Sequence, residues 1–375
     1  MKKKQMILRC AKILCVVLCF LVLSDVCVDL FKFQDYNVIK MESFYSEPKD
    51  TLDVVLLGAS ETFTDFSSAH AYDLYGFTGY PYALDANPGS VYESQLREIR
   101  NHQSPQKIVV EINGFLYDDP KLQTDSGCLR RYLNNIPISF NWAKTILEET
   151  AQEEWYFIFF PLFKCHERWK TVDEQLPWLQ DSYKIRFGAS RLKGNVSTLN
   201  CYSGPASRNV SGDMTTAPLE PLAEECLVDF LDYCKEEKID NLLFVRFPHV
   251  IATEESYERY CRGNEAERII REYGYDFLNL ERDGQAIGLD EATDYYNEDH
   301  LNYRGQQKLT AYLGKLLVDD YGVKPSELTQ KQKEDWDTAA QYSRRFYALC
   351  DEWIDTQRGR ALYESTSLME ILDQR

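Results

Sequence analysis

The feature that most constrains the fold of this chain is a regular alternation between short apolar runs and segments with helical spacing. The apolar runs have the length of buried strands, and they cover residues 53–58, 80–84, 107–112, 241–246 and 277–280. Helix-like segments lie between them at 90–102, 219–238 and 254–273, and a fourth follows the last run at 306–321. Strands alternating with helices predict an α/β fold with a doubly wound parallel sheet of about five strands. Such folds bind their ligands at the carboxyl ends of the strands.

The alternation spans residues 53–322, and it is interrupted and followed by segments of different character. Residues 115–215 are less regular, so we expect an insertion that either shapes a pocket or lid or forms a cap without substrate contact. Residues 323–375 are polar and helix-favouring, which predicts a helical C-terminal extension. Its apolar stripe at helical spacing is expected to be a packing face; the stripe consists of Trp336, Tyr342, Phe346, Leu349 and Trp353.

Residues 1–32 join a basic start to an apolar run from Ile13 to Leu23. Taken from Ala11 to Phe31, the segment is long enough to span a bilayer. The basic flank predicts a cytoplasmic N-terminus and an extracytoplasmic remainder. A cleaved signal peptide is the alternative, but no small-x-small cleavage site follows the run. We therefore expect a single-pass signal-anchor in the cell membrane, followed by a linker over residues 33–52.

The formal net charge of −18 restricts the partners of the exported part. Nucleic-acid binding needs basic surface, so no nucleic-acid partner is expected. Seven cysteines lie beyond the membrane segment without paired C-x-x-C spacing, so we expect no metal site and no cofactor. A disulfide joining Cys128 to Cys165 or Cys201 is the one pairing that the insertion suggests.

Two loops carry the residues with the clearest potential for chemistry. Ser60, in Gly58-Ala-Ser60, follows the first predicted strand, and His300 lies just before the last predicted helix. A serine hydroxyl needs a base before it can act as a nucleophile, and a histidine returning to the same rim can supply one. The alternative for Ser60 is a helix N-cap, since Ser-Glu-Thr begins many helices.

Together with Gly89 after the second strand and Asn113 after the third, these residues resemble the SGNH (GDSL-like) hydrolase superfamily over Asp53 to Tyr321. The most similar stretch is His300-Leu-Asn-x-x-Gly305. The set looks most like the membrane-anchored branch that includes the teichoic-acid D-alanine transfer protein and the alginate and cell-wall O-acetylation proteins. This resemblance implies a flavodoxin-like three-layer fold, with Ser60 as nucleophile and His300 as base. It also implies an oxyanion site made by the backbone N–H groups of Ser60 and Gly89, with Asn113.

The chain departs from the superfamily where the third catalytic residue belongs. Three residues before the histidine the superfamily usually has aspartate, and this chain has Asn297. An amide oxygen can orient the imidazole ring but stabilises imidazolium poorly. Asp299 and Asp294 are the nearby carboxylates that could substitute, although the side chain of Asp299, next to His300, tends to point elsewhere. Our preferred hypothesis is that Asn297 orients His300.

Four more ionisable residues lie near these loops. Glu61 and Asp65 are expected to be helix-start acids favoured by the helix dipole. His249, after the fourth strand, faces the expected rim, either in contact with substrate or in structural hydrogen bonds. Arg246 is a possible charge partner for acidic neighbours.

The sequence therefore predicts an extracytoplasmic serine-dependent esterase or O-acyltransferase that forms an acyl-Ser60 intermediate. Its expected substrate is a cell-envelope glycan or lipid-linked polymer. The resemblance implies a multi-span membrane O-acyltransferase as partner. The alternative is an envelope binding or assembly protein that keeps the fold with weak or no catalysis.

Overall fold

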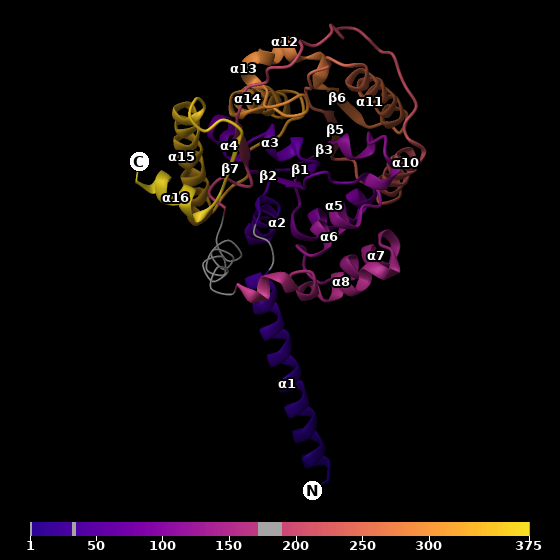
Figure 1. Ribbon diagram of the computed structural model, residues 1–375, viewed down its shortest axis with the longest axis vertical. Coiled ribbons are helices and arrows are strands. Elements are labelled where there is room, and N and C mark those ends of the chain that lie inside the picture. Colours follow the sequence, from indigo (N-terminus) through magenta and orange to yellow (C-terminus); the bar gives the residue numbers. More distant parts are fainter. Residues whose placement is uncertain (1, 32–34, 172–189, 375) are drawn as a thin grey trace.

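A computed structural model describes residues 2–31, 35–171 and 190–374. Five parallel strands form one sheet in the spatial order β2-β1-β3-β5-β6 (Figure 1). Counted along the chain, this is the 2-1-3-4-5 order of flavodoxin-like doubly wound sheets. The predicted parallel sheet is confirmed, and the first and last residues of each strand lie within one residue of their expected positions. The strands are β1 (Val54–Gly58), β2 (Gly79–Ala83), β3 (Lys107–Glu111), β5 (Leu242–Arg246) and β6 (Asp276–Asn279).

Alternate residues of the strands pack on opposite faces of the sheet, which gives the fold three layers. Val55 and Leu57 of β1 belong to one core, and Val54 and Leu56 to the other. Each is fully buried, which contributes about 1.5–3 kcal/mol per side chain relative to exposure. The first face is covered by α2 (Tyr36–Ser46), α5 (Tyr92–His102), α10 (Pro221–Glu236) and α11 (Glu254–Glu272). The second is covered by α4 (Ser68–Tyr75), α12 (Gly284–Ile287) and α14 (Tyr303–Asp319).

The N-terminal helix α1 (Lys2–Phe31) extends away from these layers (Figure 1). Its stretch Gln5–Val28, 24 residues long, is apolar enough to cross a membrane, and its most apolar part is not buried against the described protein. At 1.5 Å per residue it is about 36 Å long, which exceeds the hydrocarbon thickness of ~30 Å.

Helix α2 occupies the segment that we expected to be a linker, so that prediction was wrong for residues 36–46. Asp35 caps the helix by accepting from two backbone N–H groups of its first turn. Phe44 is buried, and its ring centroid lies 4.5 Å from that of Tyr82 in β2. The pattern concealed the helix because polar Lys40 and Ser43 are buried along with its apolar residues.

The insertion predicted at 115–215 and the C-terminal extension pair with each other. Strand β4 of the insertion is antiparallel to β7 of the extension, with Val196 opposite Tyr363. The described elements of the insertion are α6 (Ser126–Leu133), α7 (Phe140–Glu149), α8 (Trp155–Phe159), β4 (Val196–Leu199) and the short turns η3 (Pro120–Leu122), η4 (Gln152–Glu154), η5 (Pro161–Phe163) and η6 (His166–Lys170). The extension consists of α15 (Gln330–Trp353), β7 (Arg360–Tyr363) and α16 (Thr366–Asp373). We expected helices alone, and the strand β7 departs from that expectation.

The apolar stripe of α15 is a packing face, as predicted. Tyr342, Phe346 and Leu349 are buried in one cluster with Tyr303, the first residue of α14. Trp336 is buried as well, in the core that α2 and α5 share, whereas Trp353 is partly exposed. The extension therefore packs beside the loop that precedes α14.

All eleven cysteines are free thiols, so the suggested disulfide from Cys128 to Cys165 or Cys201 is not formed. Cys128 and Cys165 are buried. Burial raises the pKa of the Cys128 thiol to about 11, which keeps it protonated and unreactive.

Candidate active site

The turns after β1, β2 and β3 meet at the carboxyl edge of the sheet. Asn87, after β2, donates from Nδ2 to Gly58 O at 2.9 Å. A Cβ on Gly89 would lie 2.4 Å from Phe115 Cδ1, so no larger residue fits there. The short elements along this edge are α3 (Glu61–Thr64), η1 (Gly89–Val91), η2 (Asn113–Phe115), η7 (Leu280–Arg282) and α13 (Glu291–Asp294).

Ser60 directly precedes α3, with helical backbone angles of φ −60° and ψ −36°. It occupies the N-cap position, but its side chain makes no capping hydrogen bond, so the N-cap interpretation is wrong. The hydroxyl Oγ instead lies 2.7 Å from His300 Nε2. The serine is partly exposed.

The loop between α13 and α14 brings His300 to this serine. Leu301 N donates to Asp65 Oδ1 at 3.0 Å, which ties the loop to the end of α3. A Cβ on Gly305 would lie 2.2 Å from Asp294 O, so glycine is needed for α14 to start against the loop. Residues 240 positions apart thereby come within hydrogen-bond distance.

Asn297 fixes the orientation and the tautomer of His300. Its Oδ1 accepts from the backbone N–H of Asp299 at 2.9 Å and lies 3.0 Å from His300 Nδ1. Because a backbone N–H only donates, the amide atom between these groups must be oxygen. Nδ1 of His300 therefore carries the proton, and Nε2 presents a lone pair to the hydroxyl of Ser60.

The surroundings of His300 keep it neutral. Burial lowers its pKa from the ordinary value of 6.5, and the negative charges of Glu61 and Asp299 oppose only part of this change. An uncharged imidazole at pH 7 is the form that can accept a proton.

The two carboxylates that we considered as substitutes do not orient His300. Asp299 forms an ion pair with Arg259. Burial alone would raise the pKa of Asp299, but Arg259 lowers it overall. Asp294 accepts from Lys308 Nζ at 2.5 Å and from the backbone N–H of Asp290 at 2.7 Å. In the part of the chain that the structure describes, Asn297 alone contacts Nδ1 of His300.

The three N–H donors expected to form the oxyanion site lie in the turns after β1, β2 and β3. The backbone N–H groups of Ser60 and Gly89 donate to no described residue. Asn113 Oδ1 accepts from Arg246 Nη1 at 3.0 Å. Because a guanidinium only donates, the amide atom of Asn113 that contacts Arg246 is the oxygen, and Nδ2 is its other end.

A buried ion-pair network adjoins Ser60, and the sequence did not predict it. His249 Nε2 lies 2.9 Å from Glu61 Oε1, and its Nδ1 lies 2.8 Å from Glu281 Oε1. Arg246 Nε lies 3.3 Å from the same Glu281 oxygen. Glu111 accepts from the backbone N–H of Asn113 at 2.6 Å. Glu61, His249, Arg246, Glu281 and Glu111 together form what we call the buried network.

The charges of the buried network balance. Burial raises the pKa of Glu61, but His249 and Arg246 outweigh it and bring it to about 2, so Glu61 is ionised. Burial and the charge of Glu61 raise the pKa of Glu111 well above its usual range, so Glu111 is neutral. Although burial opposes it, the neighbouring carboxylates raise the pKa of His249. Two anions, Glu61 and Glu281, thus face two cations, Arg246 and His249.

These contacts correct one expectation, extend another and decide two more. Glu61 is the first residue of α3, as expected, but it is also fully buried and paired, whereas Asp65 ends α3 instead of starting it. His249 has the structural role that was one of its two alternatives, and Arg246 has the acidic partners expected of it. The signal available in the sequence was a charged residue at the end of two adjacent buried strands, Glu111 in β3 and Arg246 in β5.

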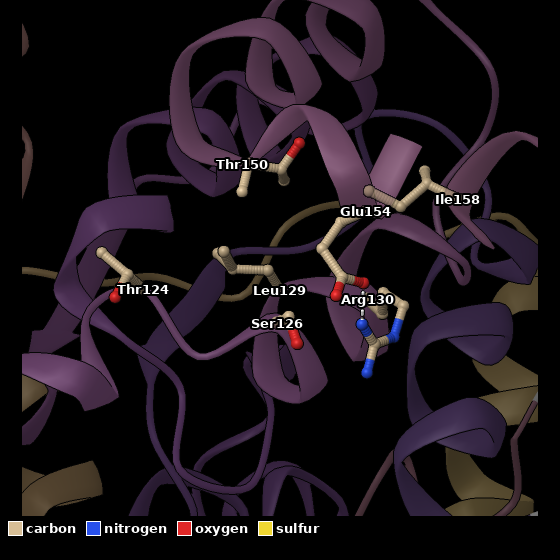
Figure 2. Close-up of a pocket in the computed structure, with 8 residues that line it drawn as sticks. Thr124, Ser126, Leu129, Arg130, Thr150, Glu154 and Ile158 are labelled. Carbon is tan, nitrogen blue, oxygen red and sulfur yellow. Dashed lines mark hydrogen bonds and ion pairs between the residues drawn. The ribbon is translucent and has the colours of Figure 1, made fainter. Parts of the chain in front are cut away.

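A small pocket lies elsewhere, among residues of α6, α8 and the segment that joins α7 to α8 (Figure 2). Arg130 and Glu154 form an ion pair across it. Its volume of about 20 Å³ is enough for roughly one water molecule, so it does not hold a substrate. Among the described residues, no group of three or more His, Cys, Asp or Glu side chains is placed to hold a metal ion.

The sequence matches no protein-family model, and the search of curated proteins found no significant match.

Proposed function

We propose that this protein is a serine-dependent esterase or O-acyltransferase that forms an acyl-Ser60 intermediate. The observation that carries the proposal is the hydrogen-bonded line from Ser60 Oγ through His300 to Asn297 Oδ1. A nucleophile bonded to a neutral base, which a third residue orients, is the arrangement used for acyl transfer.

The reaction needs only these groups and the substrate. Ser60 Oγ attacks the carbonyl carbon of an ester while its proton passes to His300 Nε2. When the tetrahedral intermediate collapses, the ester C–O bond breaks and the leaving alkoxide takes that proton. Water or a sugar hydroxyl then attacks the acyl-serine, gives its proton to His300, and Ser60 leaves as a hydroxyl.

The three N–H donors support the same proposal. The tetrahedral intermediate carries negative charge on the former carbonyl oxygen, which preorganised donors stabilise. The backbone N–H groups of Ser60 and Gly89, together with Asn113 Nδ2, are the candidates. Arg246 and Glu111 hold Asn113 from both its side chain and its backbone.

The connection to α1 favours a substrate at a membrane surface. Phe31 ends α1 and Asp35 caps α2 only four residues later, a separation of at most about 14 Å. The ring of Tyr36 packs on that of Phe63 at 5.8 Å, and Phe63 lies in the helix that Ser60 precedes. If α1 is the predicted anchor, with its N-terminus in the cytoplasm, Ser60 works close to the outer membrane face. A cell-envelope glycan or a lipid-linked polymer is the substrate class that fits this position.

The resemblance to the membrane-anchored SGNH branch favours transfer over hydrolysis. A multi-span membrane O-acyltransferase is the partner that such transfer would need for its acyl groups. The alternative, an assembly protein without catalysis, has the same fold but does not need a neutral histidine within 2.7 Å of a partly exposed serine.

Acylation by an activated ester tests the proposal. The full chain incubated with an aryl acetate should gain one acetyl group on Ser60, found by peptide mass spectrometry. Ser60→Ala should gain none, and His300→Ala should acylate roughly 10²–10⁴-fold more slowly. Ser90→Ala is the matched control, because the Ser90 hydroxyl lies on the same rim but donates to Gln123 O at 2.8 Å.

Deacylation then separates the two reactions. Release of acetate in water alone indicates an esterase, and release only when a sugar acceptor is added indicates a transferase. Absence of any Ser60 adduct would favour the assembly protein instead.

A further inference from the structure

Large aromatic side chains are exposed on one segment of the insertion. Tyr156, Phe159, Phe160, Phe163 and Trp169 are each 43–54% exposed, and we call them the aromatic patch. They lie in the segment that contains α8, η5 and η6. The rings of Tyr156, Phe160 and Phe163 adjoin, with 4.8 Å between the centroids of Tyr156 and Phe163, whereas the ring of Phe159 packs on Trp142. A contiguous exposed apolar surface of this kind marks an interaction site rather than ordinary surface.

The aromatic patch lies at the domain end of α1. The rings of Phe31, the last residue of α1, and Trp169 are 6.4 Å apart. Arg168 Nη1 donates to the backbone oxygen of Phe31 at 2.9 Å. Figure 1 shows the segment from α8 onward running across this end of α1, on the side of the domain from which the helix departs. A membrane crossed by α1 would therefore meet this segment.

The net charge of this segment suits contact with a lipid surface better than the net charge of the whole chain does. Residues 155–170 contain three basic residues and one acidic residue, a net charge of +2, in a chain of net charge −18. The basic residues, Lys164, Arg168 and Lys170, directly follow the aromatic run, and Trp169 lies between two of them. Aromatic rings concentrate at the headgroup level of membranes, and each nearby Lys or Arg contributes about 1 kcal/mol on anionic lipid.

From these observations we infer that the aromatic patch inserts into the headgroup region of the membrane that α1 crosses. The inference rests on the proposed membrane anchor and not on catalysis. A single helix leaves a domain free to tilt, whereas a second contact beside it fixes which side faces the bilayer. The first turn of α2, which contacts the helix after Ser60 through Phe63, then stays near the membrane in one orientation.

A depth-dependent fluorescence measurement tests this inference. The full chain is placed in nanodiscs of phosphatidylcholine and phosphatidylglycerol, with or without a lipid carrying a quencher near its headgroup. Phe160→Trp adds a reporter within the aromatic patch. Met214→Trp is the matched control, because Met214 is also exposed and lies beside α11, where Asp213 bonds Tyr257.

The tryptophan added by Phe160→Trp should lose most of its emission to the quencher, and that added by Met214→Trp should lose almost none. Co-elution of the chain with the nanodisc reports on α1 separately. A chain that does not co-elute contradicts the anchor and the inference together. A chain that co-elutes but leaves the Phe160→Trp reporter unquenched overturns the inference alone and points to a protein partner for the aromatic patch.

Discussion

Asn297 stands where a catalytic carboxylate would stabilise the imidazolium form of His300. Its amide oxygen orients the ring through the 3.0 Å contact with Nδ1, but it carries no full negative charge. We therefore expect Asn297→Asp to acylate on the order of tenfold faster or more, because the new carboxylate stabilises the protonated base. The rate of Ser60 acylation by an aryl ester measures this.

Asp299→Ala is the matched control for that substitution. The Asp299 carboxylate pairs with Arg259, so its loss should leave the acylation rate within about twofold, the ordinary scale of a surface ion pair. An unchanged rate in Asn297→Asp together with a large loss in Asp299→Ala would show that Asp299 supports the base.

The pH dependence of acylation follows from the burial of His300. Only neutral histidine accepts the serine proton, so the rate should rise with pH as His300 loses its charge. Burial lowers its pKa from 6.5, so the half-maximal rate should lie below pH 6.5. In Asn297→Asp the added negative charge raises the pKa of His300, and the midpoint should move upward. A pH–rate profile from about pH 4 to 9 checks both midpoints, and a wild-type midpoint above 6.5 would contradict this account of the base.

The loops at the carboxyl edge depend on the buried network, which makes it the clearest test at the level of elements. Glu61→Gln leaves His249 charged and without one of its anions, which should cost about 3–5 kcal/mol of unfolding free energy. Glu254→Gln is the matched control, because Glu254 forms an exposed ion pair with Arg208 worth at most about 1 kcal/mol. Urea unfolding of both variants measures the difference.

Glu61 and His249 give opposite dependences of stability on pH. The pKa of Glu61 is lowered from 4.5 to about 2, so its contribution is complete above pH 4.5 and is lost as pH falls toward 2. The pKa of His249 is raised above 6.5, so its contribution is complete below pH 6.5 and is lost as pH rises through the raised value. Glu61→Gln should therefore flatten the acid limb of a stability profile; an acid limb as steep as that of the wild type would contradict this assignment.

Packing of the C-terminal extension supports the start of α14, just after His300. Phe346 is fully buried in the cluster that contains Tyr303, and Tyr347 OH donates to Gln306 Oε1 at 2.8 Å. Phe346→Ala should therefore lower the unfolding free energy by about 3–5 kcal/mol. Phe140→Ala, at an exposed position of α7, should change it by about 0.5 kcal/mol or less. Equal changes of unfolding free energy in the two variants, measured with denaturant, would show that the extension does not unfold cooperatively with the sheet domain.

The sequence predicted those elements that are determined by residues close together in the chain. Each strand of the sheet is a short apolar run bounded by turn residues, so its place could be read within one residue. Ser60 and His300 could be selected because their loops adjoin the first strand and the last helix. The pairing of β4 with β7 could not be predicted, because the two strands lie more than 150 residues apart and neither has a long apolar run. The buried network could be predicted only in part: Glu111 and Arg246 end adjacent strands, but nothing local pairs Glu61 with His249 or brings Glu281 of η7 to both His249 and Arg246.

At the scale of the whole molecule, α1 would determine where the proposed chemistry takes place. If it is retained as an anchor, the full chain should stay in the membrane fraction after alkaline extraction. In cells, a protease added from outside should degrade the domain but leave the basic N-terminal stub protected. A soluble chain that begins beyond Phe31 would show instead that the segment is a cleaved signal peptide.

Labelling of the full chain with a fluorophosphonate tests the central claim most directly, because the reagent reacts with serines that an adjacent base activates. The account predicts one adduct, mapped to Ser60, that is absent in Ser60→Ala, strongly reduced in His300→Ala and unchanged in Ser90→Ala. A folded wild-type protein that takes up no label, or takes it up equally in Ser60→Ala, would contradict the claim that Ser60 is an activated nucleophile.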